Sequence, residues 1–469
     1  MSARGKFFAL AVGVLFFNLG ACMPIGTDDD STQAQWQRNE EKLKALYANV
    51  VGTYSGAVAI AGREKGLQAS FILYTVKVDD GTDVNNVPKS HTELRAQLRF
   101  DQVGEYDDHT FKVDYKEHTG EVFLTQISGA ASQVGGAVAT CPVGPKDPAL
   151  QIRGYVIDGR FHGDLISNGK IGSFQMLRKS ADIEVPLRDQ AQRLMRAFER
   201  ISGTYDGAVG TADAPLAARI VFRVEQVSAG PGLSCPELAA YFRYTSAIGE
   251  LNDSAFKVTY RESTGEVLLS YRGNASAGAC AVGPNDNELK IEGFLRDSRL
   301  KGSMSGATGD FGPLSFEKVS ENIEIENDQA ERLTQVYKKI VGTYSGRFNY
   351  GTGSFPVKIV VNILFKHMNS FVTCPVLTAQ YFRPDMTIDP SIGMILLSAD
   401  YYPRTDRLVL KTDAQMPTTG RPGSKDLHID AILNASGFSG QMTWWNRSGT
   451  LKVKRCSSGN VTPQGECRN

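Results

Sequence analysis

The sequence contains few of the features that identify nucleic-acid-binding proteins, multi-span membrane proteins or metal proteins. Lysine plus arginine and aspartate plus glutamate number 51 each, so no excess charge favours a nucleic acid or another highly charged partner. After residue 22 no apolar run is long enough to span a bilayer as a helix. The six histidines are scattered and form no HxH or HExxH motif, and no CxxC is present, which argues against a metal site.

Signatures of catalysis are missing as well. No GxSxG, no catalytic-triad order and no paired-carboxylate pattern is present. A phosphate-binding loop would need GxxxxGK[ST] or GxGxxG between a strand and a helix, and the chain has neither in that position. We therefore expect no enzyme and no cofactor. A hydrolase assembled from distant residues is kept as a minor alternative.

What the chain does have begins with an export signal. Arg4 and Lys6 precede an apolar run over 7–19, which is too short to cross a bilayer as a stable helix. The run ends in LGAC at 19–22, with small residues directly before Cys22. This combination resembles the lipobox of bacterial lipoproteins.

The lipobox resemblance implies cleavage before Cys22 and lipidation of its thiol, so that acyl chains hold the mature chain in a membrane. The Met at position 23, in place of Asp, favours the outer membrane by the sorting rule of enteric bacteria. An ordinary secretory signal that is cut nearby is the alternative.

Three nearly identical six-residue motifs show internal repetition. They are VGTYSG at 51–56, SGTYDG at 202–207 and VGTYSG at 341–346. FKVDYKEHTGEVFL at 111–124 also matches FKVTYRESTGEVLL at 256–269. A period of about 140 residues is the size of an independent domain. We therefore divide the chain into a signal peptide (1–21), a lipidated tether (22–35), three repeats (36–182, 183–321 and 322–455) and a C-terminal tail (456–469).

Each repeat is expected to begin with an amphipathic helix that leads into the repeated motif. The order helix, glycine, strand is the reverse of a phosphate loop, and the electronegative C-terminus of the helix would repel phosphate. We therefore interpret the motif as a structural joint, in which glycine ends the helix and tyrosine closes a barrel end. The residues of this joint are Gly52 and Tyr54, Gly203 and Tyr205, and Gly342 and Tyr344.

The remainder of each repeat shows the period-two alternation of β-strands. The second repeat has eight such segments, near 204–211, 217–227, 236–245, 255–262, 266–273, 288–296, 299–306 and 313–319. Eight meandering strands with one apolar side predict a mainly β fold of three tandem antiparallel barrels. A β-sandwich is the alternative.

A helix that leads into Gly-Thr-aromatic, followed by an eight-strand meander, resembles the calycin group, the lipocalins and their relatives. In that group a Gly-x-Trp near the first strand closes one end of the barrel, whereas this chain has tyrosine. The resemblance implies a carrier of small apolar ligands.

Six cysteines besides Cys22 favour disulfides in an exported protein. They are Cys141, Cys235, Cys280, Cys374, Cys456 and Cys467. A local Cys456–Cys467 loop and a Cys235–Cys280 bridge within the second repeat are the simplest pairings, and a Cys141–Cys374 bridge between repeats is a further alternative. A Cys235–Cys280 bridge would conflict with a strict meander, which places the two cysteines at opposite ends of the barrel.

The aromatic pairs Tyr401-Tyr402 and Trp444-Trp445 occur in the third repeat and have no counterpart in the other two. One residue of each pair should point outward, as contact anchors do; packing against the second repeat is the alternative. We therefore expect a non-enzymatic binding module of the cell envelope, lipid-anchored to the outer membrane. Its partner would be an envelope protein, a glycan or an apolar small ligand.

Overall fold

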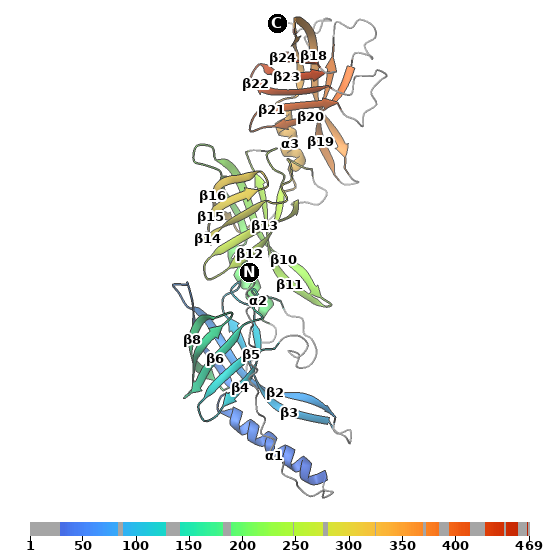
Figure 1. The fold of residues 1–469 in the computed structure, drawn as a ribbon. Coiled ribbons are helices and arrows are strands. Elements are labelled where there is room, and N and C mark those ends of the chain that lie inside the picture. Colours follow the sequence, from blue (N-terminus) through green and yellow to red (C-terminus); the bar gives the residue numbers. More distant parts are fainter. Residues whose placement is uncertain are drawn as a thin grey trace, which may run out of the picture.

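The computed structural model describes residues 29–82, 88–127, 141–181, 189–246, 248–274, 280–323, 325–368, 372–383, 394–412, 427–444, 447–457 and 467. These residues form three closed antiparallel barrels of eight strands each, arranged one after another in an elongated molecule (Figure 1). Each strand pairs with its neighbour in sequence, and the eighth strand of each barrel closes on the first. The predicted mainly β fold is confirmed, and the sandwich alternative is wrong.

The strands and helices follow one plan three times. Barrel 1 consists of β1 (Gly52–Ile60), β2 (Leu67–Thr82), β3 (Pro88–Phe100), β4 (His109–Lys116), β5 (Glu121–Gln126), β6 (Gln151–Ile157), β7 (Arg160–Ile166) and β8 (Lys170–Ser180). Barrel 2 consists of β9 (Gly203–Val209), β10 (Leu216–Gly230), β11 (Leu233–Tyr244), β12 (Ser254–Arg261), β13 (Glu266–Asn274), β14 (Lys290–Arg296), β15 (Arg299–Gly306) and β16 (Gly309–Ser320). Barrel 3 consists of β17 (Gly342–Tyr350), β18 (Gly353–His367), β19 (Thr373–Phe382), β20 (Met394–Tyr402), β21 (Arg407–Thr412), β22 (His428–Asn434), β23 (Gly437–Trp444) and β24 (Arg447–Arg455).

One helix precedes each barrel: α1 (Asp29–Ala48), α2 (Gln190–Ile201) and α3 (Gln329–Lys338). α1 begins inside the stretch 22–35 that we assigned to a tether, so the second half of that stretch is helical. Among the described residues, no helix has the length and apolar character that crossing a membrane requires. The lipobox lies outside the described residues.

The repeated Gly-Thr-Tyr motif forms the contact between each helix and its barrel. The backbone of Gly203 has φ +137°, and a Cβ there would lie 2.5 Å from the carbonyl oxygen of Ser320 on the last strand. Only glycine accepts both conditions. Two residues later, the buried Tyr205 hydroxyl donates a hydrogen bond to the carbonyl oxygen of Ile201 at 2.8 Å. Tyr54 and Tyr344 make the same bond, to the carbonyl oxygens of Val50 (2.8 Å) and Ile340 (2.7 Å).

A cation on the last strand of each barrel completes this contact. Arg455 donates to the carbonyl oxygens of Lys339 (3.0 Å) and Val341 (2.6 Å), just after α3. Arg178 does the same at the end of α1, with the carbonyl oxygen of Val51. These side chains satisfy carbonyl groups that a helix C-terminus leaves unpaired. The Gly-Thr-Tyr motif is therefore a structural joint between helix and barrel, which fits the order of helix, glycine and strand in the sequence.

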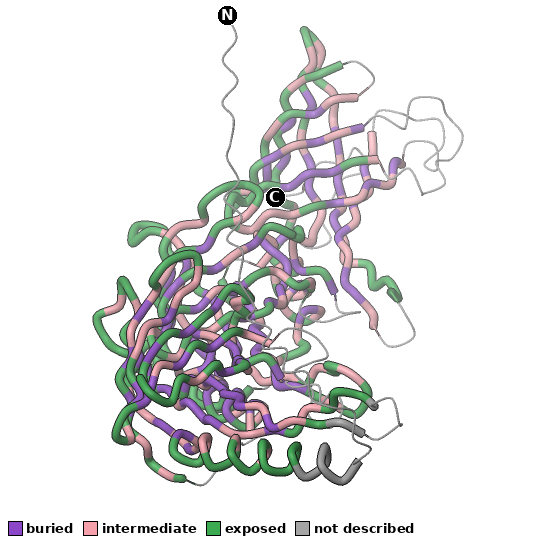
Figure 2. The backbone as a smooth tube through the Cα atoms, turned by 60° about the horizontal axis from the view of Figure 1, so that its bottom comes forward, coloured by how far each residue is buried: buried purple, intermediate pink, exposed green. Residues whose placement is uncertain are grey.

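The barrel interiors are packed with side chains. Figure 2 shows buried segments alternating with exposed ones along the barrel strands. In barrel 1 the rings of Tyr54 and Phe161 lie 5.8 Å apart, and Phe174 lies 4.8 Å from Phe161 and 5.0 Å from Phe71. Ring pairs at these distances add to the free energy of burial. Large aromatic residues thus fill the region of barrel 1 next to its helix.

The second and third strands of each barrel extend beyond the barrel wall as a two-stranded hairpin. In barrel 2, β10 pairs with β9 only over 216–222 and β11 pairs with β12 only over 239–242, whereas β10 and β11 pair with each other as far as Gly230. The β10–β11 hairpin therefore projects from the barrel beside α2 (Figure 1). β18 and β19 form the equivalent projection in barrel 3.

Candidate functional site

Disulfides join neighbouring barrels rather than residues of one barrel. Cys141, before β6 of barrel 1, is bonded to Cys235 on the β10–β11 hairpin. Cys280, before β14 of barrel 2, is bonded to Cys374 on β19, again with a sequence separation of 94 and a Cα–Cα distance of 5.4 Å. Each hairpin thus reaches back to the preceding barrel and is bonded there.

These bonds correct the pairing that the sequence suggested within the second repeat. Cys235 lies at the helix end of barrel 2, and Cys280 lies at the opposite end, so a Cys235–Cys280 bridge cannot form in this meander. The Cys141–Cys374 alternative is wrong for the same reason, because each residue has a partner in the adjacent barrel. The predicted local loop Cys456–Cys467 is confirmed.

We expect peptide mapping without reduction to find this pairing. Tryptic digestion should give one species that links the peptides of Cys141 and Cys235, and another that links those of Cys280 and Cys374. Mass spectrometry of the digest before and after reduction checks the result. A linked Cys235–Cys280 species would contradict the barrel arrangement described above.

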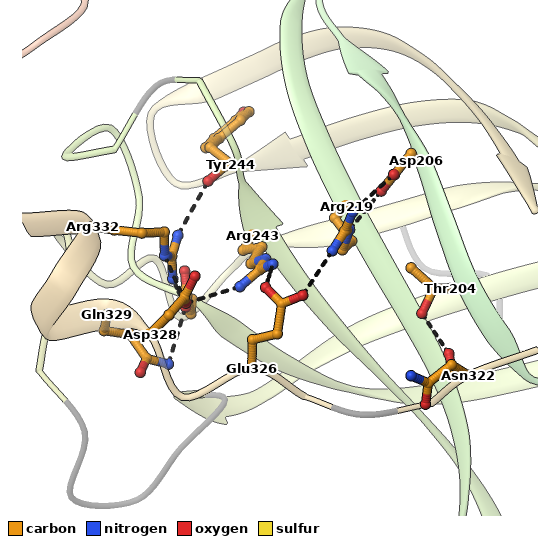
Figure 3. A network of polar contacts seen from close by, with 11 residues as sticks. Thr204, Asp206, Arg219, Arg243, Tyr244, Asn322, Glu326, Asp328, Gln329 and Arg332 are labelled. Carbon is orange, nitrogen blue, oxygen red and sulfur yellow. Dashed lines mark hydrogen bonds and ion pairs between the residues drawn. The ribbon is translucent and has the colours of Figure 1, made fainter. Parts of the chain in front are cut away.

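A buried polar network lies beside each inter-barrel disulfide. At the second joint Arg332 of α3 pairs with Asp253 of barrel 2 and bonds Asp328 at 3.0 Å, and Gln329 donates to Asp253 at 3.2 Å (Figure 3). Arg243, on β11, bonds Asp328 at 3.0 Å. Burial raises the pKa of Asp253, and Arg332 and Gln329 act in the opposite direction. The network fixes the start of α3 to the end of barrel 2 that is opposite α2.

The first joint has the same residues in the same places. Arg193 of α2 bonds Asp108 at 2.5 Å and Gln190 donates to Asp108 at 3.1 Å. Arg99 pairs with Asp189 just before α2. Burial again raises the pKa of Asp108, against the influence of Arg193. The two helices share the sequence D-Q-A-x-R-L, at 189–194 and 328–333, and this is the signal that could have revealed the joint.

The cleft beside the first joint belongs to that joint. It measures about 710 Å³ and is lined by both barrels, including Arg63, Glu262 and Ser263. Arg63 pairs with the buried Glu105, which also accepts a hydrogen bond from Ser263 of barrel 2. Because the Ser263 hydroxyl of barrel 2 bonds both members of this barrel 1 ion pair, the cleft contributes to docking of the two barrels.

The joint chemistry is absent from the two outer ends of the described chain. α1 has RNEEKL at 38–43 where the other helices have D-Q-A-x-R-L. In barrel 3 the strand register places Phe382 where barrel 2 has Arg243, and Met394 where it has Asp253. The residues of the two joints are therefore not repeated at either outer end of the described chain.

Barrel 3 has aromatic and arginine side chains at the end where barrels 1 and 2 carry a joint. The guanidinium carbon of Arg383 lies 4.8 Å from the Phe355 ring centroid and 5.6 Å from that of Trp444. Arg447 lies 5.2 Å from the centroid of Tyr350, and the Tyr381 ring lies 6.2 Å from Trp444. Cations at such distances over aromatic faces are attracted by the ring quadrupole. We call these residues the aromatic–arginine cluster: Tyr350, Phe355, Tyr381, Arg383, Trp444 and Arg447.

The register shows that this cluster is specific to barrel 3. Trp444 occupies the position of Gly306 in barrel 2, and Phe355 that of Leu216. All members except Arg447 are half-buried or buried, so the rings are held by the barrel rather than extended into solvent. An ordered set of rings and guanidinium groups can stack on a flat ligand and donate hydrogen bonds to it.

The four aromatic residues expected to bind a partner are not brought together. Trp444 belongs to the cluster, and Trp445 lies outside the described residues. Tyr401 packs on the core at the helix end of barrel 3, where its hydroxyl donates to Asp406 at 2.7 Å and burial raises its pKa. The neighbouring Tyr402 lies 5.8 Å from Arg407, which is paired with Asp430.

Sequence reasoning thus found one of the six cluster residues. The others were missed because Tyr350, Phe355 and Arg383 stand on three separate segments and become neighbours only in the closed barrel. No protein-family model and no curated protein matches this chain.

Proposed function

We propose that the protein is a non-enzymatic binding protein of the bacterial cell envelope, lipid-anchored to the outer membrane through Cys22. Barrels 1 and 2 act as a support of defined geometry, and barrel 3 presents the binding site at the aromatic–arginine cluster. One observation carries this proposal. The residues that dock a following barrel are repeated in barrels 1 and 2. At the equivalent end of barrel 3, stacked aromatic and arginine side chains stand in their place.

Two further features support the proposal. The LGAC sequence at 19–22 resembles a lipobox, and three disulfides fit an oxidising compartment outside the cytoplasm. The calycin-like alternative, a carrier of apolar ligands, would need a chamber inside a barrel. The packed rings of Tyr54, Phe71, Phe161 and Phe174 give it no support in barrel 1.

The anchor is tested by replacing the lipidated residue. We expect the Cys22→Ser protein to leave the outer-membrane fraction of a Gram-negative host and to appear in the soluble envelope fraction, because acyl chains supply the membrane affinity. Fractionation with immunoblotting measures the change, and metabolic labelling with a clickable fatty acid should mark only the wild type. Retention of the unlabelled variant in the outer membrane would contradict anchoring through Cys22.

The binding site is tested on an array of envelope polymers that contains proteins, neutral glycans and acidic glycans. The full chain in detergent should bind at least one class, and Trp444→Ala should weaken that binding by tenfold or more, as expected for a central aromatic anchor. Phe294→Ala is the matched control, since Phe294 is an exposed ring on the wall of barrel 2. Equal binding by wild type and Trp444→Ala would overturn the assignment of the site.

A further inference from the structure

The balanced charge of the whole chain conceals a segregated charge in barrel 3. Five adjacent strands, β23, β24, β17, β18 and β19, contain no aspartate or glutamate. They contain seven cationic residues, and Arg383 follows directly after β19. The seven are Arg347, Lys358, Lys366, Arg447, Lys452, Lys454 and Arg455. We call this surface, together with Arg383, the basic face.

The equivalent strands of the other barrels carry both signs. In barrel 2 they hold Asp206, Glu225, Glu237, Asp310 and Glu317, and in barrel 1 Asp79, Asp80, Glu93 and Asp164. Their cations are correspondingly paired. Arg219 bonds Asp206 at 2.6 Å, Arg299 bonds Glu317 at 3.2 Å, and Lys170 bonds Asp164 at 2.7 Å.

Three cations of the basic face have no such partner among the described residues. Within the described part of the chain, no carboxylate forms an ion pair with Arg347, Lys358 or Lys452. Arg347 and Lys452 stand directly opposite each other on β17 and β24, and both are exposed. Like charges in opposite positions of a sheet reduce its stability. Barrel 3 thus retains an arrangement that costs stability and that an anionic ligand would relieve.

The basic face is continuous with the aromatic–arginine cluster. Arg447 and Arg383 belong to both, and Lys358 lies 5.5 Å from the ring centroid of Phe382, the residue before Arg383. A ligand bound here would meet stacked rings at the barrel end and a row of solvent-accessible cations along the adjoining wall.

Resting on the function proposed above, we infer that the partner of barrel 3 is an acidic glycan, a chain of sugar rings that carry carboxylate groups. Sugar rings stack on aromatic side chains through their apolar faces, and arginine binds carboxylate in bidentate geometry. Spaced carboxylates along a polymer match cations spread over several strands. A nucleic acid also combines flat rings with negative charge. The disulfides and the export signal, however, favour a compartment outside the cytoplasm, where nucleic acids are not the usual partners.

The test compares three polymers on the full chain in detergent: polygalacturonate, neutral dextran and a single-stranded oligonucleotide. We expect polygalacturonate to bind most tightly and its affinity to fall as salt is raised, because exposed charges are screened. Replacing Arg347, Lys452 and Arg447 together by glutamine should lower that affinity by more than tenfold. A matched variant replaces Arg296, Arg299 and Lys301 of barrel 2 by glutamine and should bind as the wild type does.

The variant of barrel 3 should stay folded, since removal of the opposed pair Arg347/Lys452 offsets the loss of the exposed hydrogen bonds from Arg347 to Ser354. Lost affinity in a variant that is still folded therefore supports the inference. Dextran binding that equals polygalacturonate binding and still depends on Trp444 would overturn the acidic partner and leave the proposed site intact. Tighter binding of the oligonucleotide would also overturn it. Absence of any Trp444-dependent binding, here and on the polymer array, would overturn the proposed function itself.

Discussion

Replacing Tyr205 by alanine will lower the free energy of unfolding of barrel 2 by about 3–5 kcal/mol, the usual cost of deleting a large buried ring. The Tyr205 side chain is 1 % exposed and its ring lies 5.3 Å from that of Phe222. Its hydroxyl also satisfies the carbonyl group of Ile201 at the end of α2. The substitution therefore opens a cavity and releases the helix from the barrel at the same time.

Two further variants separate these contributions. Tyr205→Phe keeps the ring and leaves one buried carbonyl unsatisfied, so we expect a smaller loss of about 1–3 kcal/mol. Tyr271→Phe is the control, because its hydroxyl bonds Asn274 at an exposed position and its loss should cost less than about 0.5 kcal/mol.

Hydrogen exchange followed by mass spectrometry measures the effect barrel by barrel. Peptides of β9 and β16 should lose protection in Tyr205→Ala, while peptides of barrels 1 and 3 keep theirs. Unchanged protection in β9 would show that the tyrosine does not close the barrel.

The fold was predictable because local sequence patterns specify its strands and helices, and these patterns recur in three repeats. The alternation of Phe256, Val258 and Tyr260 with polar residues predicts a strand without knowledge of its neighbours. The order of helix, glycine and strand at Gly203 likewise predicts the joint between helix and barrel. Repetition then turned an ambiguous pattern into a count of domains.

The disulfide pairing was not predictable, because it depends on how far a hairpin extends. Cys235 and Cys280 share a repeat, and the sequence does not show that β10 and β11 continue beyond the wall of barrel 2 toward barrel 1. The cluster in barrel 3 was missed for a related reason. Its residues are distant in sequence, and their meaning appears only when strand register shows that Trp444 replaces a glycine.

The buried network at the second joint centres on the carboxylate of Asp253. Replacing Asp253 by alanine should weaken docking of barrel 3 by about 3–5 kcal/mol, the usual cost of removing one partner of a buried ion pair. Arg332 is only 12 % exposed, and it would keep Asp328 as a carboxylate partner at 3.0 Å. Glu326→Ala is the control, because its side chain is half exposed and an exposed ion pair contributes less than about 1 kcal/mol.

The disulfide Cys280–Cys374 decides what this loss looks like in an experiment. In the oxidised protein the bond holds the β18–β19 hairpin against barrel 2, so the barrels stay together even in Asp253→Ala. After mild reduction the wild type should stay docked through its polar network, while Asp253→Ala should release barrel 3 and increase the radius of gyration measured by small-angle X-ray scattering. Equal scattering from the two reduced proteins would mean that the network adds nothing to docking. An increase in the reduced wild type as well would assign the joint to the disulfide alone. The expected result, an increase that needs both changes, would establish that two independent contacts hold barrel 3 in position.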